Sequence, residues 1–172
     1  SVLKTTGLAV DCGRDCCSIV PISDGFAHAH AASQLGIGGK ALDDYLCELL
    51  KKSDLVDLRT TAERDIARDM KERLCFVARD FQAEEALQNR RDYEIPDGRV
   101  IQVGHDRFHC PEALFNPRLL DSETPGLHQL VFQCAMACDA SVRFDLFNNI
   151  MLSGGSSMFP GMAERMTKEL RA

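Results

Sequence analysis

The sequence predicts a mixed α/β fold, and three patterns indicate that class. Residues 7–22 are predicted to form a β-hairpin, because two short apolar runs flank a turn that contains Gly13. Residues 149–170 are predicted to form a buried strand, a glycine-rich turn and a helix. Two segments with helical periodicity lie between these regions, so strands and helices alternate along the chain.

The first half of the chain contains both of those helical segments. A third short strand is expected over 26–30, and the glycines of 36–39 form a flexible junction. A helix is expected over about 40–52, where leucines recur at helical spacing. A second helix starts at Thr60, because Glu63 completes the spacing of a capping box.

The second half combines a hairpin with several short helices. Residues 83–92 are polar and are expected to form a loop or a short exposed helix. Residues 93–101 are expected to form a β-hairpin around the turn Pro96-Asp97-Gly98. Further helices are expected at 111–115, opened by Pro111, and at 127–137, 142–147 and 162–170.

Charge and hydropathy exclude several classes of partner. The formal net charge is -6 and the sequence pI is about 5.3, whereas proteins that bind duplex nucleic acid or anionic membranes need a basic face. No apolar run approaches the ~20 residues of a membrane span, so we expect no membrane insertion. The first residues resemble no signal peptide and include no initiator methionine, so we expect the chain to be part of a longer protein.

The eight cysteines are expected to be reduced. Several lie inside apolar runs, such as Cys75 in Leu74–Phe76 and Cys47 after Tyr45-Leu46, which is typical of buried free thiols. Cys134 and Cys138 lack the second ligand pair of a zinc site. Free thiols favour the cytosol as the compartment.

Two glycine-bearing loops and one helix face carry groups that could bind a ligand. Asp11 and Gly13 follow a strand, where a carboxylate can hold a hydrated cation and a glycine admits a phosphate. The loop 153–157 places two glycines before a helix, which suits a flat or anionic ligand. Arg68, Lys71 and Glu72 share a helix face.

Each of these features also has a purely structural interpretation. The Asp11 loop could be an ordinary hairpin turn, the glycine pair a tight strand-to-helix turn, and the charged helix face a solvated surface with internal ion pairs. The five histidines are scattered along the sequence and indicate no metal site or catalytic triad, so packing or surface roles are expected for them.

Taken together, the segments resemble actin and the actin-related proteins along nearly the whole chain. The most specific stretch is the run over 60–78. The matching segments are TTGLAVDCG at 5–13, VPISDGFA at 20–27, TTAERDIARDMKERLCFVA at 60–78, YEIPDGRVI at 93–101, RFHCPEALFNP at 107–117 and MLSGGSSMFPG at 151–161.

This resemblance implies half of the ATPase fold that actin shares with Hsp70 and hexokinase, in which two α/β domains enclose an ATP cleft. Residues 1–37 and 123–172 would form most of the third subdomain, with the fourth inserted as residues 38–122. The first phosphate loop, the water-positioning glutamine and the first two subdomains would lie upstream of this chain, and the final C-terminal segment is also absent from it.

The resemblance further implies a site for ATP or ADP with Mg²⁺. Asp11 and Gly13 would lie on the phosphate side, with Asp11 holding the hydrated metal. Phe159 stands where actin has tyrosine. The adenosine pocket would use Gly39, Arg68, Lys71, Glu72, Gly154, Gly155, Met158 and Phe159.

The phosphate loop departs from the family pattern. Arg14 replaces an acidic residue that helps hold the metal, and Asp15 replaces a glycine that approaches the phosphates. Ser18 replaces the histidine near the attacking water. A carboxylate against polyphosphate adds repulsion on the order of 1 kcal/mol or more, which the Arg14 cation would partly offset.

Three functions follow as hypotheses. The first is a divergent actin-like protein with a structural or assembly role in the cytoplasmic cytoskeleton. Its partners would be other actin-like or cytoskeletal proteins, and this chain alone would not be an ATPase. The second is a polymerising ATPase completed by segments outside this chain. The third is a half-domain that binds partner proteins without nucleotide. No catalytic residue is assigned.

Overall fold

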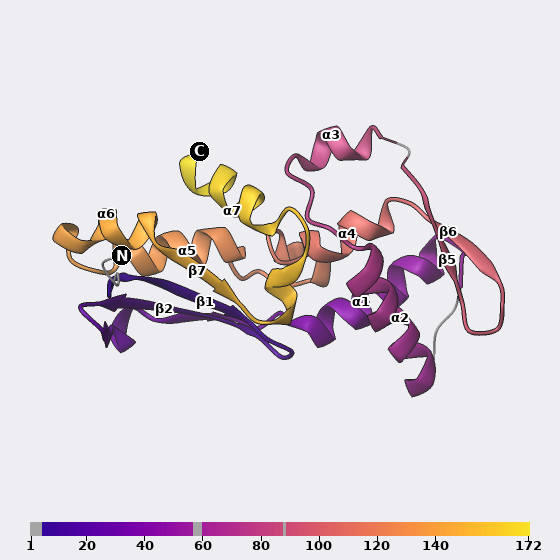
Figure 1. The fold of residues 1–172 in the computed structure, drawn as a ribbon, viewed down its shortest axis with the longest axis horizontal. Coiled ribbons are helices and arrows are strands. Elements are labelled where there is room, and N and C mark those ends of the chain that lie inside the picture. Colours follow the sequence, from indigo (N-terminus) through magenta and orange to yellow (C-terminus); the bar gives the residue numbers. More distant parts are fainter. Residues whose placement is uncertain (1–4, 57–59, 88) are drawn as a thin grey trace.

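The computed structural model describes residues 5–56, 60–87 and 89–172, which form two adjoining parts (Figure 1). The first part is built on a five-stranded mixed sheet, and the second is mainly helical with a two-stranded sheet. The strands of the larger sheet are β1 (Gly7–Cys12), β2 (Cys17–Ser23), β3 (Phe26–Ala27), β4 (Ser33–Leu35) and β7 (Ile150–Ser153).

The large sheet brings the two ends of the sequence together. β1 pairs antiparallel with β2, with Cys12 opposite Cys17, so the predicted hairpin is confirmed. β1 also pairs in parallel with β7, where Leu8 lies beside Ile150. β3 and β4 both pair antiparallel with β2. The glycine-rich loop after β7 therefore lies next to the turn that follows β1.

Helices cover one face of this sheet, and the alternation of residues in β1 explains which face. Leu8, Val10 and Cys12 are buried, whereas Asp11 between them is exposed. The helices α5 (Leu127–Met136) and α6 (Ala140–Asn148) contact β1 and β2, and α7 (Met162–Arg171) packs on α5. The predicted C-terminal strand, turn and helix are confirmed.

The second part is organised around three helices. The capping box of α2 is present, since the Thr60 side chain accepts from the Glu63 amide and the Glu63 carboxylate accepts from the Thr60 amide. The helix α1 packs against α2 and α4, and the strands β5 and β6 form the predicted hairpin (Figure 1). The elements are α1 (Gly39–Lys52), α2 (Thr61–Leu74), α3 (Phe81–Glu85), α4 (Asp106–Glu112), β5 (Arg91–Glu94) and β6 (Val100–Val103).

The prediction that Pro111 opens a helix is wrong. The helix α4 begins at Asp106 and contains Pro111 near its end. A proline there leaves the carbonyl of the residue four positions earlier without its helical donor. That carbonyl belongs to Arg107, and it accepts instead from the amide of Phe76 at 3.2 Å. A contact distant in sequence thus allows the helix to pass through the proline.

Other boundaries shift by smaller amounts. The strand expected over 26–30 ends at Ala27, and a 3₁₀ turn follows over Ala29–Ala31. The polar strand β4 was not predicted. The strand β5 starts at Arg91, inside a segment expected to be a loop or helix. The division into 1–37 with 123–172 and the insert 38–122 stays a prediction.

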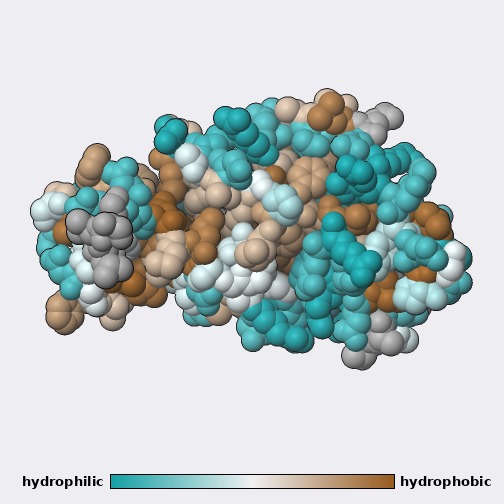
Figure 2. Space-filling model, viewed as in Figure 1, coloured by the Kyte–Doolittle hydropathy of each residue, from teal (hydrophilic) through white to brown (hydrophobic). Residues whose placement is uncertain are grey.

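The surface differs between the two parts. Apolar side chains are exposed over the end that carries α5, α6 and β7, whereas polar residues cover α2 (Figure 2). Within the described ranges, no helix is both long and apolar enough to cross a membrane. The eight cysteines are unpaired; Cys75 is buried as expected, whereas Cys47 is half-buried.

Tyr93 provides a test of the packing between β5 and α2. Its hydroxyl donates to Asp69 Oδ2 at 2.7 Å, and burial together with this hydrogen bond raises the pKa of Tyr93 to about 12. Since the folded pKa exceeds the unfolded value near 10, we expect the stabilisation from the protonated hydroxyl to be complete below pH ~10 and lost as the pH rises towards ~12.

Tyrosinate absorbance measures this directly, because the chain has two tyrosines and no tryptophan. Burial also raises the pKa of Tyr45, so Tyr93→Phe is needed to assign the transition. The variant should lose the component near pH 12, whereas in urea both tyrosines should titrate near pH ~10. If Tyr93 in the folded protein titrates with a midpoint near pH ~10, the packing of Tyr93 against Asp69 is contradicted.

Candidate functional site

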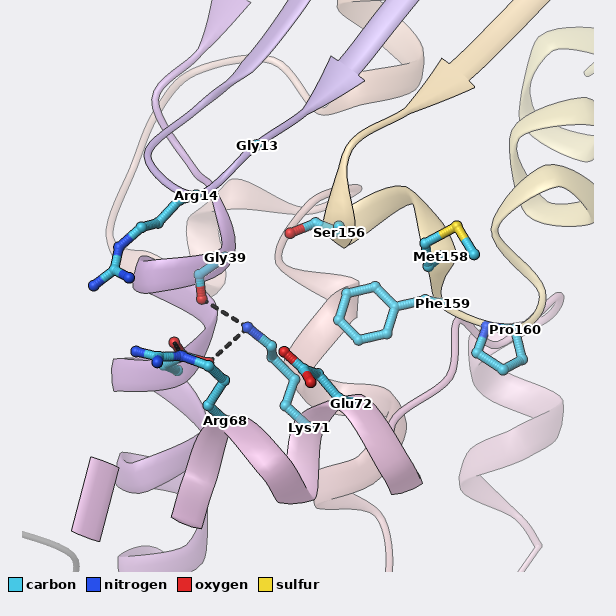
Figure 3. Close-up of a pocket in the computed structure, with 12 residues that line it drawn as sticks. Gly13, Arg14, Gly39, Arg68, Lys71, Glu72, Ser156, Met158, Phe159 and Pro160 are labelled. Atoms are coloured by element: carbon cyan, nitrogen blue, oxygen red, sulfur yellow. Dashed lines mark hydrogen bonds and ion pairs between the residues drawn. The ribbon is translucent and has the colours of Figure 1, made fainter. Parts of the chain in front are cut away.

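A cavity lies where the two parts of the molecule meet (Figure 3). Its volume is about 590 Å³. Four segments contribute to it: the turn after β1, the start of α1, one face of α2 and the loop after β7. The residues that line it are Gly13, Arg14, Gly39, Asp43, Arg68, Lys71, Glu72, Gly155, Ser156, Met158, Phe159 and Pro160.

The first wall depends on close contact between the hairpin turn and α1. The amide of Gly39 donates to Gly13 O at 3.0 Å, and that of Lys40 donates to Arg14 O at 2.8 Å. A Cβ atom on Gly38 would lie 2.5 Å from Arg14 O, so glycine is required for this approach. Because the turn already occupies the Gly39 and Lys40 amides, they are not free to bind an anion.

A buried charge network forms the floor. Lys71 is 6% exposed; its Nζ donates to Gly39 O at 2.9 Å and pairs with Asp43 Oδ1 at 2.6 Å. Arg68 Nε pairs with the other oxygen of Asp43 at 3.3 Å. An ammonium group has three donors, so Lys71 retains one beyond these two contacts. Asp43 therefore holds both cations at the cavity, and Figure 3 shows Lys71 and Arg68 side by side there.

The opposite wall is the loop that follows β7. Gly154 has φ of 85°, and a Cβ atom there would lie 2.4 Å from Cys12 O, so the loop can close onto β1 only with glycine. A 3₁₀ turn then spans Gly155–Met158. Phe159 is largely buried with its ring towards the cavity, whereas Met158 is 79% exposed (Figure 3). This wall is therefore apolar.

Glu72 faces this apolar wall across the cavity (Figure 3). The residue is exposed, and its carboxylate has no hydrogen bond or ion pair within the described part of the chain. A Cβ atom on Gly155 would meet no atom within 4 Å, which shows open space on the opposite side. The cavity thus offers a free acceptor facing an apolar surface.

Most of the predicted site residues come together here. Arg68, Lys71 and Glu72 share one face of α2 as expected, and they meet the glycine loop across the cavity. Asp11 and Gly154 lie outside the cavity lining; Ser153 Oγ donates to Asp11 Oδ1 at 2.9 Å beside the loop.

Sequence reasoning missed Asp43 and Pro160, and it named Ser156 only as part of the loop 153–157. Asp43 follows Gly39 by four residues, so helical spacing places both on one face of α1, and this signal could have identified it. Ser156 is buried, with its Oγ 3.3 Å from the position of a Cβ atom on Gly39. The adjacent glycines marked its loop as a candidate site, but nothing in the sequence distinguished Ser156 from its neighbours in that loop.

The residues present fit a nucleoside better than they fit a polyphosphate. A flat apolar group can lie against Met158 and Phe159, while Glu72 and the remaining donor of Lys71 suit hydroxyl groups and polar ring edges. On the phosphate side, Arg14 supplies a cation at the cavity edge, but Asp15 is exposed in the same turn. Its negative charge opposes bound phosphate.

The fit to a hydrated Mg²⁺ rests on Asp11 alone. Mg²⁺ is commonly held by one or two carboxylates, waters and substrate phosphates, so a single exposed carboxylate beside the cavity is compatible with it. Within residues 5–56, 60–87 and 89–172, no group of three histidine, cysteine or acidic ligands includes Asp11. Any metal here would therefore depend on the ligand's own oxygens.

Comparison with known protein families agrees with this arrangement. A family model described as Actin matches residues 1–172, the full length of the chain. The mixed α/β content and the mixed sheet also fit an actin-like fold. On this match, the chain is a member of the actin family.

Proposed function

We propose that this protein is a divergent actin-like assembly protein whose cavity holds an adenine nucleotide, ATP or ADP, as a structural ligand. One observation carries the proposal: the Glu72 carboxylate, which has no partner among the described residues, faces the apolar wall of Met158 and Phe159 across open space. This combination suits a nucleoside, which presents a flat base and a hydroxyl-bearing sugar.

Each side chain has a distinct part in this proposal. Glu72 accepts hydrogen bonds from ribose hydroxyl groups, and Lys71 directs its remaining donor to the nucleoside. Met158 and Phe159 cover the base, and Gly155 leaves the space that the base occupies. Arg68 belongs to the same face of α2 and holds Asp43 in place.

The phosphate side supports binding without rapid hydrolysis. Mg²⁺, held through water by Asp11, would neutralise phosphate charge, while Gly13 lets the backbone approach. Neither Arg14 nor Ser18 supplies a general base for an attacking water, because the first is a cation and the second a neutral hydroxyl. The Asp15 carboxylate opposes the approach of the phosphates. Hydrolysis by a complete polymerising ATPase is the alternative.

Membership of the actin family supports a cytoskeletal role for this protein. We place the protein in the cytoplasm, in a cytoskeletal assembly whose other members are actin-like or cytoskeletal proteins. The net charge of -6 argues against direct binding to nucleic acid.

Calorimetric titration with ADP and Mg²⁺ tests the site through Glu72→Gln. Because Glu72 is exposed and unpaired among the described residues, the variant should fold normally. Loss of a charge-assisted hydrogen bond should weaken binding about 10-fold or more.

The matched control is Glu94→Gln, at another exposed glutamate, which lies on β5 outside the cavity lining. It should bind ADP as the unaltered protein does. Equal affinity in both variants would exclude Glu72 as a ligand, and undetectable ADP binding by the unaltered protein would contradict the proposed function.

A further inference from the structure

Two histidines and a glutamate converge on the surface, outside the lining of the proposed nucleotide cavity. His105 and His109 lie one helical turn apart at the start of α4, and Glu85 ends α3 beside them. His109 Nε2 lies 2.8 Å from Glu85 Oε2, and His105 Nδ1 lies 3.7 Å from Glu85 Oε1. One ligand atom from each residue can be chosen so that all lie within 4.8 Å of one another.

The backbone sets this geometry, although His105 formally precedes the helix. His105 has helical dihedral angles, φ -64° and ψ -28°, and its carbonyl accepts from the His109 amide at 3.0 Å. Residues four apart in a helix project from the same face. The two imidazole rings are accordingly stacked, with an angle of 7° between their planes.

Aromatic packing holds the cluster in place. The Phe81 ring, at the start of α3, lies 5.0 Å from the His109 ring and 5.5 Å from the Phe108 ring. Phe108 also contacts both histidines. These contacts restrict the imidazole rings before any ligand arrives, which lowers the entropy cost of binding.

We propose that Glu85, His105 and His109 form a surface site for Zn²⁺. Imidazole nitrogens and a carboxylate oxygen are ordinary zinc ligands, and tetrahedral bonds of ~2.0–2.2 Å place ligand atoms about 3.3–3.6 Å apart. The two histidine-to-carboxylate separations, 2.8 and 3.7 Å to different oxygens of Glu85, lie on either side of that spacing. The three ligand atoms lie within 4.8 Å of one another, so the side chains have to draw together by about 1 Å around the ion. Zinc replaces the hydrogen bond between His109 Nε2 and Glu85 Oε2, the proton of that hydrogen bond is released to solvent, and water completes the coordination of the metal.

The site would add a metal link between α3 and α4, which already meet through the ring of Phe81 and the Glu85–His109 hydrogen bond. The helix α3 spans only Phe81–Glu85 and has no buried residue. Zinc bound between Glu85 and the α4 histidines would fix the end of α3 to the body of the second part (Figure 1). An ordinary hydrogen bond between Glu85 and His109 would do this only weakly, because both side chains are partly exposed.

Calorimetric titration of the metal-free protein with ZnCl₂ tests the site. We expect one equivalent of zinc to bind. The double variant His105→Asn/His109→Asn removes both imidazole ligands. Loss of a residue that only hydrogen-bonds to a metal ligand weakens metal binding by ~10–100-fold, so loss of the two ligands themselves should weaken zinc binding by at least this factor. The matched control is His28→Asn/His30→Asn, which removes another contacting histidine pair, with ring centroids 5.7 Å apart, and should bind zinc unchanged.

The cysteines require a separate readout, because Cys16 and Cys47 are only half-buried. Co²⁺ in place of zinc should give ligand-field bands without thiolate charge-transfer absorption. Circular dichroism verifies that the variants fold. If the double variant does not fold, Glu85→Gln, a change at a partly exposed side chain, provides a second variant in which zinc binding should be weakened. Thiolate absorption, no saturable zinc binding, or unchanged affinity in the folded ligand variants would overturn the proposal.

Discussion

Replacing Arg165 with methionine should lower the free energy of unfolding by about 3–5 kcal/mol, the cost of leaving one partner of a buried ion pair alone. Arg165 on α7 makes a bidentate pair with Glu112 on α4, with N–O distances of 2.8 and 2.9 Å. It also donates to Ala78 O at 2.8 Å and stacks over the Phe115 ring. Both charged side chains are over nine-tenths buried.

The expected cost comes from the carboxylate that the variant leaves behind. Burial already raises the pKa of Glu112 above its ordinary value of 4.5, even though Arg165 opposes that shift. Because the pKa of Glu112 is higher in the folded protein than in the unfolded protein, ionisation of Glu112 lowers the free energy of unfolding as the pH rises through the folded pKa. The penalty of Arg165→Met should therefore be largest at neutral pH and shrink as the solution is acidified towards pH ~4.5.

Chemical denaturation at two pH values measures this effect, with Lys168→Met as the matched control. Lys168 lies on the same helix and pairs with Asp80 at 2.9 Å, but both side chains are about half exposed. Exposed pairs contribute about 0–1 kcal/mol. If Arg165→Met costs no more than Lys168→Met, the pair does not join α4 to α7 in the manner described.

The adjacent glycines of the loop after β7 should respond very differently to alanine. Gly154→Ala should cost about 3 kcal/mol, because φ of 85° with ψ of 161° is a glycine-only conformation and the methyl group would meet Cys12 O at 2.4 Å. Gly155→Ala should change stability by only about 0.5 kcal/mol or less, since no atom lies within 4 Å of the new Cβ.

Thermal unfolding of the two variants under identical conditions tests this contrast. The Gly155→Ala protein should unfold near the temperature of the unaltered protein but bind ADP more weakly, because its methyl group enters the cavity. Equal unfolding temperatures for the two variants would show that the loop does not close onto β1 as the structure indicates.

Local patterns in the sequence predicted the elements that depend on local chemistry. The capping box at Thr60 and the Pro96-Asp97-Gly98 turn each fix a boundary through nearby residues, and both were placed correctly. The start of α4 was misplaced because its proline is accommodated by the Phe76 amide, a partner distant in the sequence. Strand β4 was missed because pairing with β2, rather than its own composition, makes it a strand.

The candidate site shows the same limit. The charged face of α2 and the glycine loop could be recognised as separate motifs, and the family resemblance brought them together. Asp43 was overlooked because its importance comes from the contacts with Lys71 and Arg68 on another helix. The cluster of Glu85, His105 and His109 was overlooked for a related reason, since Glu85 reaches the histidines only after α3 folds back onto α4.

The most direct test of the central claim is a time course with protein in excess over radiolabelled ATP and Mg²⁺, sampled for both bound nucleotide and free phosphate. We predict that the labelled nucleotide becomes bound to an extent that saturates as the protein concentration is raised, with phosphate release no faster than in buffer. Absence of saturable binding would contradict the nucleotide site, and phosphate release that the protein accelerates would contradict a purely structural role for the ligand.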